Sequence, residues 1–542
     1  MAPVGAEAAT LEAVATSPEP RRLRVGLFCD SCLQPRWVVE AFDKVARSGF
    51  AEIALLAVGG APPGEPLLWK AYNGLDRLAF ARGEDPGERI DIVSAVPHKR
   101  LCSEGKANVD LDVAFAIGTI DDRTLDGLAR HGVWRFHFTG GEALAGFREV
   151  ARGEPLTASA LKFRLSANAP ARIAYQSWSR TYSLSAARNR EQLLAKTAEF
   201  ALRALGELHR SGPAWLEQCK AENRGQSPIS SDSGYSGYRA LTPIFRIGAR
   251  ILQRSLQKAL NVEQWFLAYR FADARSPRFG DPRAIPPDLR GYVRLMPPKD
   301  RYWADPFALE KNGRYFVFFE ELPFKTGRAH ISMMEIDRAS GQASPPVRVL
   351  ERDYHLSYPF LIEHEGQLYM IPETAQRGTV EAYRCIDFPL RWKLERVLMS
   401  GVRCVDATFH RAADRFWMFA NAAASGSRMF DDELHLFHSD RLLGDWQPHP
   451  RNPVKSDARC ARPAGQLYWK EGVLYRPAQI CAPLYGSGLS INRVVRLTPR
   501  EYIERQVERI LPAGEAGLLG VHTVNRAGDL TVIDAFAKRA RF

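Results

Sequence analysis

Five residues that suit acid–base chemistry or polar binding recur at intervals of roughly 50–60 positions in the C-terminal half of the chain. Each precedes a short apolar run, a turn such as Asn312-Gly313, and a second run that ends in another polar side chain. A turn of this kind between two apolar runs predicts a β-hairpin. The leading residues are Asp305, Tyr358, Asp406, Arg462 and His522, and the second runs end in Glu320 or Glu321, Glu373, Asn421, Gln479 and Asp534.

Repeats of this length with several strands in each are typical of propeller blades, so the five repeats predict an all-β five-bladed propeller over residues 262–542. The first strand of each blade lines the central channel, which brings equivalent positions together at one mouth. Polar residues at these positions therefore indicate a ligand-binding funnel. Gln264–Arg270 reads as a strand outside the repeats. Because a closed propeller leaves no exposed sheet edge, we expect this strand to pair with residues near 530.

Several motifs recur in order over about residues 262–540. They are Tyr302-Trp-Ala-Asp-Pro-Phe, Ser357-Tyr-Pro-Phe, Met370-Ile-Pro-Glu, Asp406-Ala-Thr, Gly444-Asp-Trp, Arg462-Pro-Ala-Gly and Leu474-Tyr-Arg-Pro-Ala-Gln. Together they resemble the propeller region of glucosamine inositolphosphorylceramide transferases. In the plant members a separate glycosyltransferase domain follows the propeller, and the transfer activity is expected to belong to that domain. This chain ends at Phe542, so the resemblance implies a carbohydrate-related role without assigning the transfer step.

More distantly, the hairpins resemble the five-bladed furanosidases, and that resemblance implies a catalytic set. Asp305 would be the base or nucleophile, Asp406 its partner, and Glu373 or Glu320 the acid. Such a pair works because one carboxyl group protonates the leaving oxygen while the other activates water or attacks the sugar. The alternative for each acid is a structural hydrogen bond between blades. Substrate-binding roles would fall to Trp303 and Tyr358 as aromatic platforms, to Arg462 and His522 as ligands of hydroxyls or a phosphate, and to Glu321 and Gln479.

Three functions fit this propeller. The first is glycosyl transfer in the synthesis of cell-surface polysaccharide or glycolipid, with a sugar or activated sugar as substrate. The second is furanosidase-type hydrolysis, and the third is sugar binding without catalysis. The N-terminal twenty residues lack the basic start and apolar centre of a signal peptide. A cytoplasmic location follows as the expectation, and it favours synthesis from activated sugars.

Residues 22–211 alternate strand and helix patterns, which predicts a parallel, doubly wound α/β domain after a disordered tail over 1–21. Motifs at residues 110–118, 132–138 and 146–155 resemble the formyltransferase N-terminal domain. In that family an Asn, a His two residues later and a downstream Asp carry the transfer. Here His137 stands at the histidine position, Arg135 replaces the Asn, and no acid occurs between Pro155 and Arg190. The scaffold is therefore expected without live formyl transfer.

Residues 212–261 are expected to form a linker followed by a basic amphipathic helix. The helix covers about 243–260 and repeats a basic residue every fourth position from Arg246 to Lys258. Such a face either rests on anionic membrane, at the inner side, or is a solvated face of a helix that packs on its neighbour domain.

Charge and cysteine usage exclude two other classes of function. The net charge of +12 is spread over 74 basic residues without a nucleic-acid motif, so we expect no nucleic-acid partner. The Cys29-x-x-Cys32 pair has no second pair or histidines at metal spacing, so we expect packed thiols and no metal site, with a redox role as the alternative. The α/β region lacks a G-x-G-x-x-G motif, and no cofactor is expected. The sequence makes no prediction of the oligomeric state.

Overall fold

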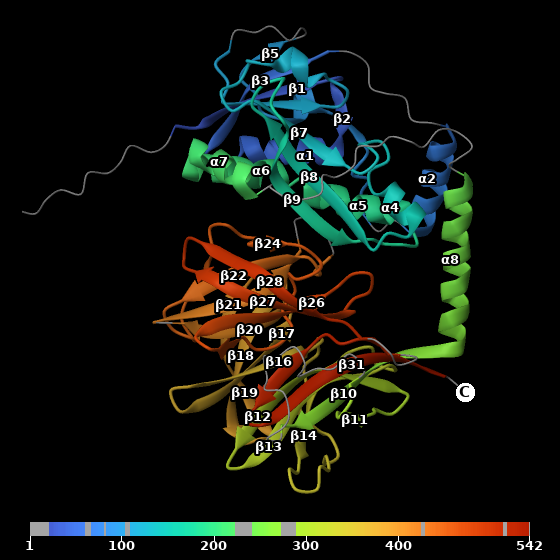
Figure 1. The fold of residues 1–542 in the computed structure, drawn as a ribbon, viewed down its shortest axis with the longest axis vertical. Helices are drawn as coiled ribbons and strands as arrows, with labels where there is room; N and C mark the ends of the chain where they lie inside the picture. The colour runs from blue at the N-terminus through green and yellow to red at the C-terminus, as the bar shows by residue number, and fades with distance from the viewer. Residues whose placement is uncertain are drawn as a thin grey trace, which may run out of the picture.

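The computed structural model describes residues 21–59, 67–80, 83–102, 109–222, 241–272, 289–412, 414–423, 429–512 and 518–540. These form an N-terminal α/β domain stacked on a C-terminal propeller, with one long helix, α8 (Leu241–Leu260), running along the side of both (Figure 1). The predicted disordered tail at 1–21 lies almost entirely outside the described residues, as does the Ser- and Gly-rich part of the predicted linker.

The N-terminal domain is built on one mixed sheet with the strand order β5-β3-β1-β6-β7-β8-β9. The first five strands are parallel, as predicted, but β8 and β9 are antiparallel to their neighbours. The short connection from β8 to β9 accounts for the antiparallel pairing of these two strands, because a parallel crossover needs a dozen or more residues. The strands are β1 (Leu23–Cys29), β3 (Ala51–Val58), β5 (Leu101–Cys102), β6 (Val113–Ile117), β7 (Val133–Phe138), β8 (Leu156–Arg164) and β9 (Arg172–Arg180). A separate small pair joins β2 (Leu33–Pro35) to β4 (Arg89–Asp91).

Helices cover this sheet and extend the domain beyond the predicted boundary at 211. Trp215, Leu216 and Cys219 of α7 are buried in the same apolar core as the sheet, so the chain from 213 to 222 belongs to the domain and not to a linker. The helices before α8 are α1 (Arg36–Ala46), α2 (Leu67–Phe80), α3 (Ile92–Ala95), the 3-10 turn η1 (Asp122–Leu125), α4 (Phe147–Arg152), α5 (Ala186–Thr197), α6 (Phe200–Ser211) and α7 (Pro213–Glu222).

Five antiparallel sheets follow α8 and confirm the five-bladed propeller. Every predicted hairpin forms around its predicted turn, because short apolar runs on both sides of a tight turn bury one face and pair directly. Blade 1 holds β12 (Arg301–Lys311), β13 (Arg314–Pro323), β14 (His330–Ile336) and β15 (Val347–Leu350), and blade 2 holds β16 (Ser357–His364), β17 (Gln367–Thr374), β18 (Thr379–Asp387) and β19 (Arg391–Ser400).

Blades 3 and 4 follow the same plan. Blade 3 contains β20 (Cys404–Ala412), β21 (Arg415–Ala422), β22 (Glu433–Ser439), β23 (Gln447–Pro448) and the short β24 (Lys455–Ser456). Blade 4 contains β25 (Tyr468–Lys470), β26 (Val473–Ile480), β27 (Gly488–Leu497) and β28 (Tyr502–Ile510).

Blade 5 is assembled from both ends of the propeller sequence. The strand that follows α8, β10 (Asn261–Phe271), pairs along its whole length with the C-terminal strand β31 (Leu530–Ala540), which places Trp265 opposite Phe536. This confirms the predicted closing strand. The blade is completed by β11 (Val293–Leu295), β29 (Leu518–Gly520) and β30 (Val524–Ala527).

Truncation after residue 515 is expected to destabilise all five blades. It removes β29, β30 and β31, and so leaves β10 without the strand that pairs along its whole length. Thermal unfolding followed by circular dichroism should show a lower midpoint and lost cooperativity, whereas a control truncated after residue 540 keeps β31 and should match the full chain. An unchanged midpoint for the shorter protein would show that the closure contributes little.

Candidate functional site

Three of the predicted leading residues share one unusual backbone conformation. Asp305, Tyr358 and Asp406 have φ values of 51°, 44° and 53°, and each lies in a bulge at the start of the innermost strand of its blade. Left-handed φ is tolerated by Asp but is strained for a bulky residue such as Tyr. Strain repeated at equivalent positions must be held in place by the surroundings, and such positions are concentrated at functional sites.

The second strand of each of these hairpins places a polar residue beside the bulge. Glu320 pairs with Ala304, Glu373 with Ser357 and Asn421 with Val405, which are the residues just before the three leading positions. Glu320, and not Glu321, is therefore the equivalent of Glu373. Blades 4 and 5 lack this bulge, so the predicted equivalence of Arg462 and His522 does not extend to the backbone, although both side chains reach the same centre.

Asp305 belongs to a buried acid–imidazole group. Its Oδ1 accepts a hydrogen bond from Thr523 Oγ1 at 2.9 Å and lies 3.5 Å from His522 Nε2. The other ring nitrogen of His522 lies 2.7 Å from Asp534 Oδ2, which also accepts from the Asp305 backbone amide at 2.8 Å. One aspartate thus fixes both the imidazole and the backbone of Asp305.

These contacts shift the proton affinities of the group. Burial raises the pKa of Asp305 well above its usual range, His522 opposes the shift, and the nearby charges of Asp406 and Glu320 add to it. For His522, burial alone would lower the pKa, but Asp534 and Asp305 outweigh it and raise the pKa above the usual value. A protonated His522 beside Asp305 favours the ionised carboxylate and so limits the rise of its pKa.

Aromatic rings enclose His522. The Trp265 ring stacks on the imidazole with 3.9 Å between centroids, and Tyr485 meets it edge-on at 5.3 Å. Gly486 has a φ of 65°, and a Cβ there would lie 2.7 Å from the Trp265 ring and 2.8 Å from His522 Cβ. A glycine is therefore required for this loop to approach the rings so closely.

Asp406 anchors a second group in the centre of the propeller. Arg462 Nε donates to its Oδ2 at 2.6 Å, and Gln479 Nε2 donates to the same oxygen at 2.7 Å. The Arg462 guanidinium also lies 4.7 Å from the centroid of the Tyr485 ring. Tyr485 thus touches both Arg462 and His522, and it joins the two groups.

Glu373 is the carboxyl group of this site that is best suited to donate a proton near neutral pH. Burial raises the pKa of Glu373 to about 7, with a further contribution from Asp406, while Arg462 and His355 oppose it. Glu320 accepts a hydrogen bond from the Tyr302 hydroxyl at 2.8 Å and lies 3.1 Å from His355 Nε2. We call the following residues the central cluster: Asp305, Glu373, Asp406, Arg462, Gln479, Tyr485 and His522.

A chain of charges links the central cluster to the N-terminal domain. Arg462 Nη1 lies 3.4 Å from Asp431 Oδ1, and the other oxygen of Asp431 accepts from Arg180 Nη2 at 2.6 Å. Arg180 ends β9, so the N-terminal domain contributes a residue that three successive ion pairs connect to Asp406. This domain therefore docks on the same end of the propeller as the central cluster.

Two further buried ion pairs follow Asp431 directly in the sequence. Lys196 Nζ lies 2.8 Å from Asp432, and Arg203 binds both oxygens of Glu433 at 2.6 and 3.0 Å. Burial alone would raise the pKa of Glu433, but Arg203 and Lys196 outweigh it and lower the pKa to about 2. Three consecutive acids of the propeller are thus each paired with a basic residue of the N-terminal domain.

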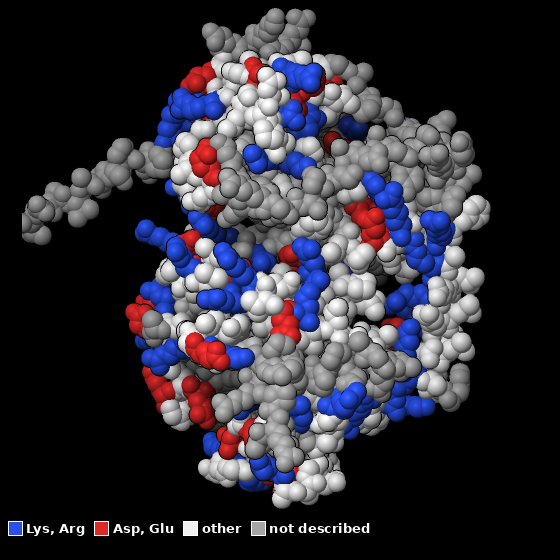
Figure 2. Space-filling view, viewed as in Figure 1, with Lys and Arg blue, Asp and Glu red and all other residues white. Residues whose placement is uncertain are grey.

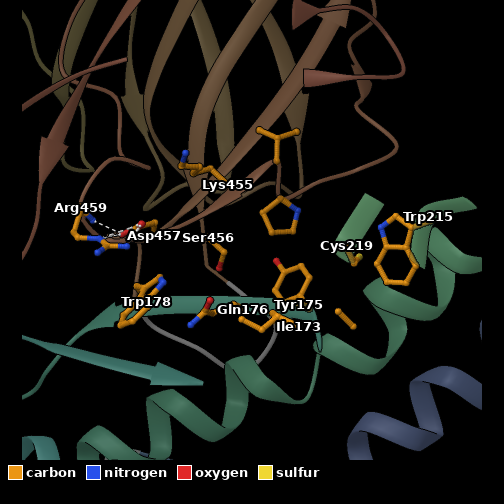
Figure 3. A pocket seen from close by; sticks show the side chains of 13 residues that line it. Ile173, Tyr175, Gln176, Trp178, Trp215, Cys219, Lys455, Ser456, Asp457 and Arg459 are labelled. Atoms are coloured by element: carbon orange, nitrogen blue, oxygen red, sulfur yellow. Dashed lines mark hydrogen bonds and ion pairs between the residues drawn. The ribbon is translucent and has the colours of Figure 1, made fainter. Parts of the chain in front are cut away.

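The same interface contains a cavity of about 650 Å³ (Figure 3). Tyr175, Gln176 and Trp178 reach into it from β9, with α7 at one side, and the propeller closes it from above with the segment from Lys455 to Arg459. Arg459 is held by Asp457 and lies over the Trp178 ring at 4.8 Å. The charged side chains that line the cavity are therefore largely paired with other side chains of the protein.

Three of the predicted substrate-binding residues have structural roles. Trp303 donates to Glu321 at 3.3 Å, and Glu321 also binds Arg301, His330 and Ser332, so that burial is outweighed and the pKa of Glu321 is held well below its usual range. Tyr358 is fully buried and its hydroxyl bonds Thr408 and the Gly465 amide. Neither ring is open to a sugar face, because both are buried in the packing between blades. The repeat pattern in the sequence does not show this burial.

Arg462 also differs from its prediction. Its guanidinium nitrogens are used by Asp406 and Asp431, so it orders the site instead of offering a free charge to a phosphate. His522 is likewise enclosed by its partners. Glu373 and His355 retain partial exposure, which makes them the better candidates for direct contact with a ligand.

Asp534 was predicted at the end of the fifth hairpin, as Glu373 was at the end of the second, but without a role in the site. Several other residues of the site were missed. Tyr485 lies in the loop between β26 and β27, and His355 lies just before β16. Arg180 belongs to the N-terminal domain. None of the three is part of the hairpin repeat, so the repeat pattern did not predict them. Trp265 was predicted only as part of the closing strand.

One group among the described residues has donor atoms close enough for a metal ion. Asp305, His522 and Asp534 each offer an atom, all within 4.8 Å of one another. Two carboxylates and one imidazole suit a divalent cation of intermediate hardness. The same atoms already satisfy each other by ion pairing, so this group is a complete hydrogen-bonded unit without a metal.

The formyltransferase-like residues are placed on β7 of the N-terminal domain. Arg135 donates to Asp122 and to the carbonyls of Gly118 and Ile120, which occupies its whole guanidinium. Burial and neighbouring basic residues lower the pKa of His137 to about 4. Arg135 thus holds the segment that follows β6 against β7. The expected lack of formyl transfer stays a prediction.

Comparisons with known proteins concern the propeller. Residues 296–520 match the family described as glucosamine inositolphosphorylceramide transferase 1, N-terminal. The chain is 30% identical over 218 residues to glucosamine inositolphosphorylceramide transferase 1 of Arabidopsis thaliana, covering 40% of this chain and 28% of that protein. The chain is 33% identical over 204 residues to the protein of the same name from Oryza sativa subsp. japonica, and the aligned region covers 37% of this chain and 27% of that protein. The chain therefore spans less than a third of the length of the curated relatives it matches.

Among solved structures, the catalytic domain of a GH62 α-L-arabinofuranosidase from Coprinopsis cinerea is similar to this chain. It aligns with a TM-score of 0.34 and 12% identity, over 51% of this chain and 98% of that one. A likeness at this level carries no functional argument, and the five blades described above stand on the strand pairing alone.

Proposed function

We propose that the central cluster binds a sugar and that the protein takes part in glycosyl transfer during glycolipid or cell-surface polysaccharide synthesis. The observation that carries the proposal is the meeting of acids from blades 1, 2 and 3 at equivalent bulges, within the region that matches a family named for a glycolipid-forming transferase. The matched region is the N-terminal part of those relatives, so the transfer step itself is part of the proposal.

Glu373 is the proposed proton donor. A carboxyl group with a pKa of about 7 is still protonated near neutral pH and can give its proton to the leaving oxygen as the glycosidic carbon–oxygen bond breaks. Tyr302, Glu320 and His355 surround it with groups that bind hydroxyls.

Asp305 is the proposed base. It would take the proton of the attacking hydroxyl as the new carbon–oxygen bond forms at the sugar. A raised pKa makes the ionised carboxylate a stronger base but lowers the fraction ionised at neutral pH, and the adjacent imidazolium of His522 restores part of that fraction. Asp406, held by Arg462 and Gln479, orders the site.

Asp305→Asn is expected to leave the fold intact and to lower transfer by about 10²–10⁴-fold, the usual contribution of a general base. Asparagine accepts the left-handed backbone at this position as readily as aspartate, so the bulge is preserved. Isothermal titration of the full chain against nucleotide sugars and oligosaccharides identifies the ligand first. Turnover of that ligand by wild type and variant is then compared, with Asp353→Asn at an exposed position of the same propeller as the control.

The outcomes separate three functions. Full activity of Asp305→Asn would make Asp305 a structural residue. Release of free sugar without an acceptor would favour hydrolysis of the furanosidase type. Binding without turnover in the wild type would favour a non-catalytic module, which the fully paired state of Asp406 also suits.

A further inference from the structure

Helix α8 joins the two domains and presents two different faces. On its inner face Ile247 is buried with Phe147 and Val150 of α4. Arg250 donates to the carbonyls of Val150, Ala151 and Ser183, which are backbone acceptors at the end of α4 and near the start of α5. The helix is therefore docked on the N-terminal domain by this face.

The docked face contains part of the basic row that was expected to meet solvent or a membrane. Arg250 is used by backbone carbonyls, and Arg254 lies 3.7 Å from Glu263. Arg250 therefore serves to dock the helix on its neighbour domain, and Arg254 is ion-paired with Glu263. The basic residues that remain exposed are Arg246 and Lys258.

The outer face of α8 is apolar and open to solvent. Phe245, Leu252, Leu256 and Leu260 are 76%, 63%, 58% and 62% exposed. At 100° per residue these four side chains fall within one narrow stripe, opposite Ile247 and Arg250. Gly248, Ala249 and Ala259 extend the stripe and are also exposed. Scattered exposed leucines are ordinary, but a contiguous row along a helix marks an interaction site.

The surroundings of the stripe point to its occupant. The sequence of α8 contains four basic residues and no acidic one. Figure 1 shows the helix at the outer margin of the molecule, and Figure 2 shows uncharged surface along this edge with Lys and Arg side chains next to it. The adjacent α2, whose Tyr72 packs against the same core as Ile247, exposes Leu75 and Leu78 at 69% and 87%.

We propose that the outer face of α8 binds the surface of a lipid bilayer that contains anionic lipids. The apolar stripe has Arg246 at its border and suits a helix that lies in the plane of the interface, with leucines among the acyl chains and this cation at the headgroups. No helix of the described residues is long and apolar enough to cross a bilayer, so the contact is peripheral. This inference does not depend on the sugar chemistry of the central cluster.

A second copy of the chain is the competing occupant, and charge disfavours it. Each chain carries a net charge of +12, and pairing two α8 helices would bring together two helices whose only charged residues are basic. An anionic membrane instead attracts basic residues near its surface.

The test is vesicle flotation of the full chain with phosphatidylcholine vesicles, with and without phosphatidylserine. The wild type is expected to float with the anionic vesicles. The triple variant Leu252→Ser/Leu256→Ser/Leu260→Ser should bind at least about tenfold more weakly, since three exposed apolar side chains are lost. Arg246→Gln should lower the preference for phosphatidylserine by about fivefold.

Two controls make the result decisive. Trp469→Ser/Val495→Ser/Val507→Ser removes three exposed apolar residues from blade 4 and should leave vesicle binding unchanged. Light scattering of the soluble protein reports its oligomeric state. Absence of flotation by the wild type, equal flotation of the α8 triple variant, or a dimer that this variant dissociates would each overturn the proposal.

Discussion

Arg203→Met is expected to lower the free energy of unfolding by about 3–5 kcal/mol. The substitution leaves Glu433, which is 1% exposed, as a charge without its bidentate partner. Methionine retains most of the volume of the arginine stem, so packing changes little and the unpaired charge dominates. Equilibrium unfolding in urea, followed by tryptophan fluorescence, measures the loss.

Two further variants isolate the charge effect at this interface. Arg203→Met/Glu433→Gln should recover most of the lost stability, because both members of the buried ion pair are then neutral. Arg451→Met removes the partly exposed partner of Glu207, which lies 3.4 Å away across the same interface, and should cost less than about 1 kcal/mol. Equal effects of Arg203→Met and Arg451→Met would show that the buried pair has no special weight.

Glu373→Gln is expected to abolish most of the proposed transfer and to change how stability depends on pH. Loss of a general acid lowers the rate by about 10²–10⁴-fold. Glutamine resembles the protonated carboxyl in shape, so the fold should be retained. The pH profile of unfolding provides a measurement that needs no substrate.

The direction of the pH effect follows from the raised pKa of Glu373. Between about pH 4.5 and 7 the unfolded chain has lost this proton while the folded protein still holds it, so wild-type stability falls as the pH rises through this range. The difference between wild type and Glu373→Gln should therefore grow over the same range, to about 3 kcal/mol. Glu363→Gln, at an exposed position of β16, is the matched control. Parallel profiles for wild type and Glu373→Gln would contradict the raised pKa.

Local patterns in the sequence determined the architecture of the propeller. Short apolar runs, turn residues and a repeat of nearly constant length specify hairpins, because they depend only on neighbours along the chain. They were sufficient to predict five blades, the closing strand around Trp265, and the alignment of Asp305, Tyr358 and Asp406. They also predicted α8 and the first parallel strands of the N-terminal sheet.

The tertiary structure alone decided which of these residues face the centre and which are consumed by packing. Tyr358 matches the repeat as well as Asp305 does, and Trp303 lies two residues before Asp305, yet both rings are buried in the packing. A positive φ at a bulge changes the face of the sheet on which the side chain lies. The conformational preference of tyrosine does not predict a positive φ at Tyr358. Arg462 and His522 reach the centre from a different backbone register, because long side chains compensate for the missing bulge.

The contacts between the two domains could not be predicted from the sequence either. Asp431, Asp432 and Glu433 look like an exposed acidic loop in the sequence, but Arg180, Lys196 and Arg203 neutralise them across the interface. Likewise, periodicity located two faces on α8 without showing which one is docked. Periodicity records the pitch of a helix or strand, whereas the partner of each face is set by the packing free energy of residues far apart in the chain.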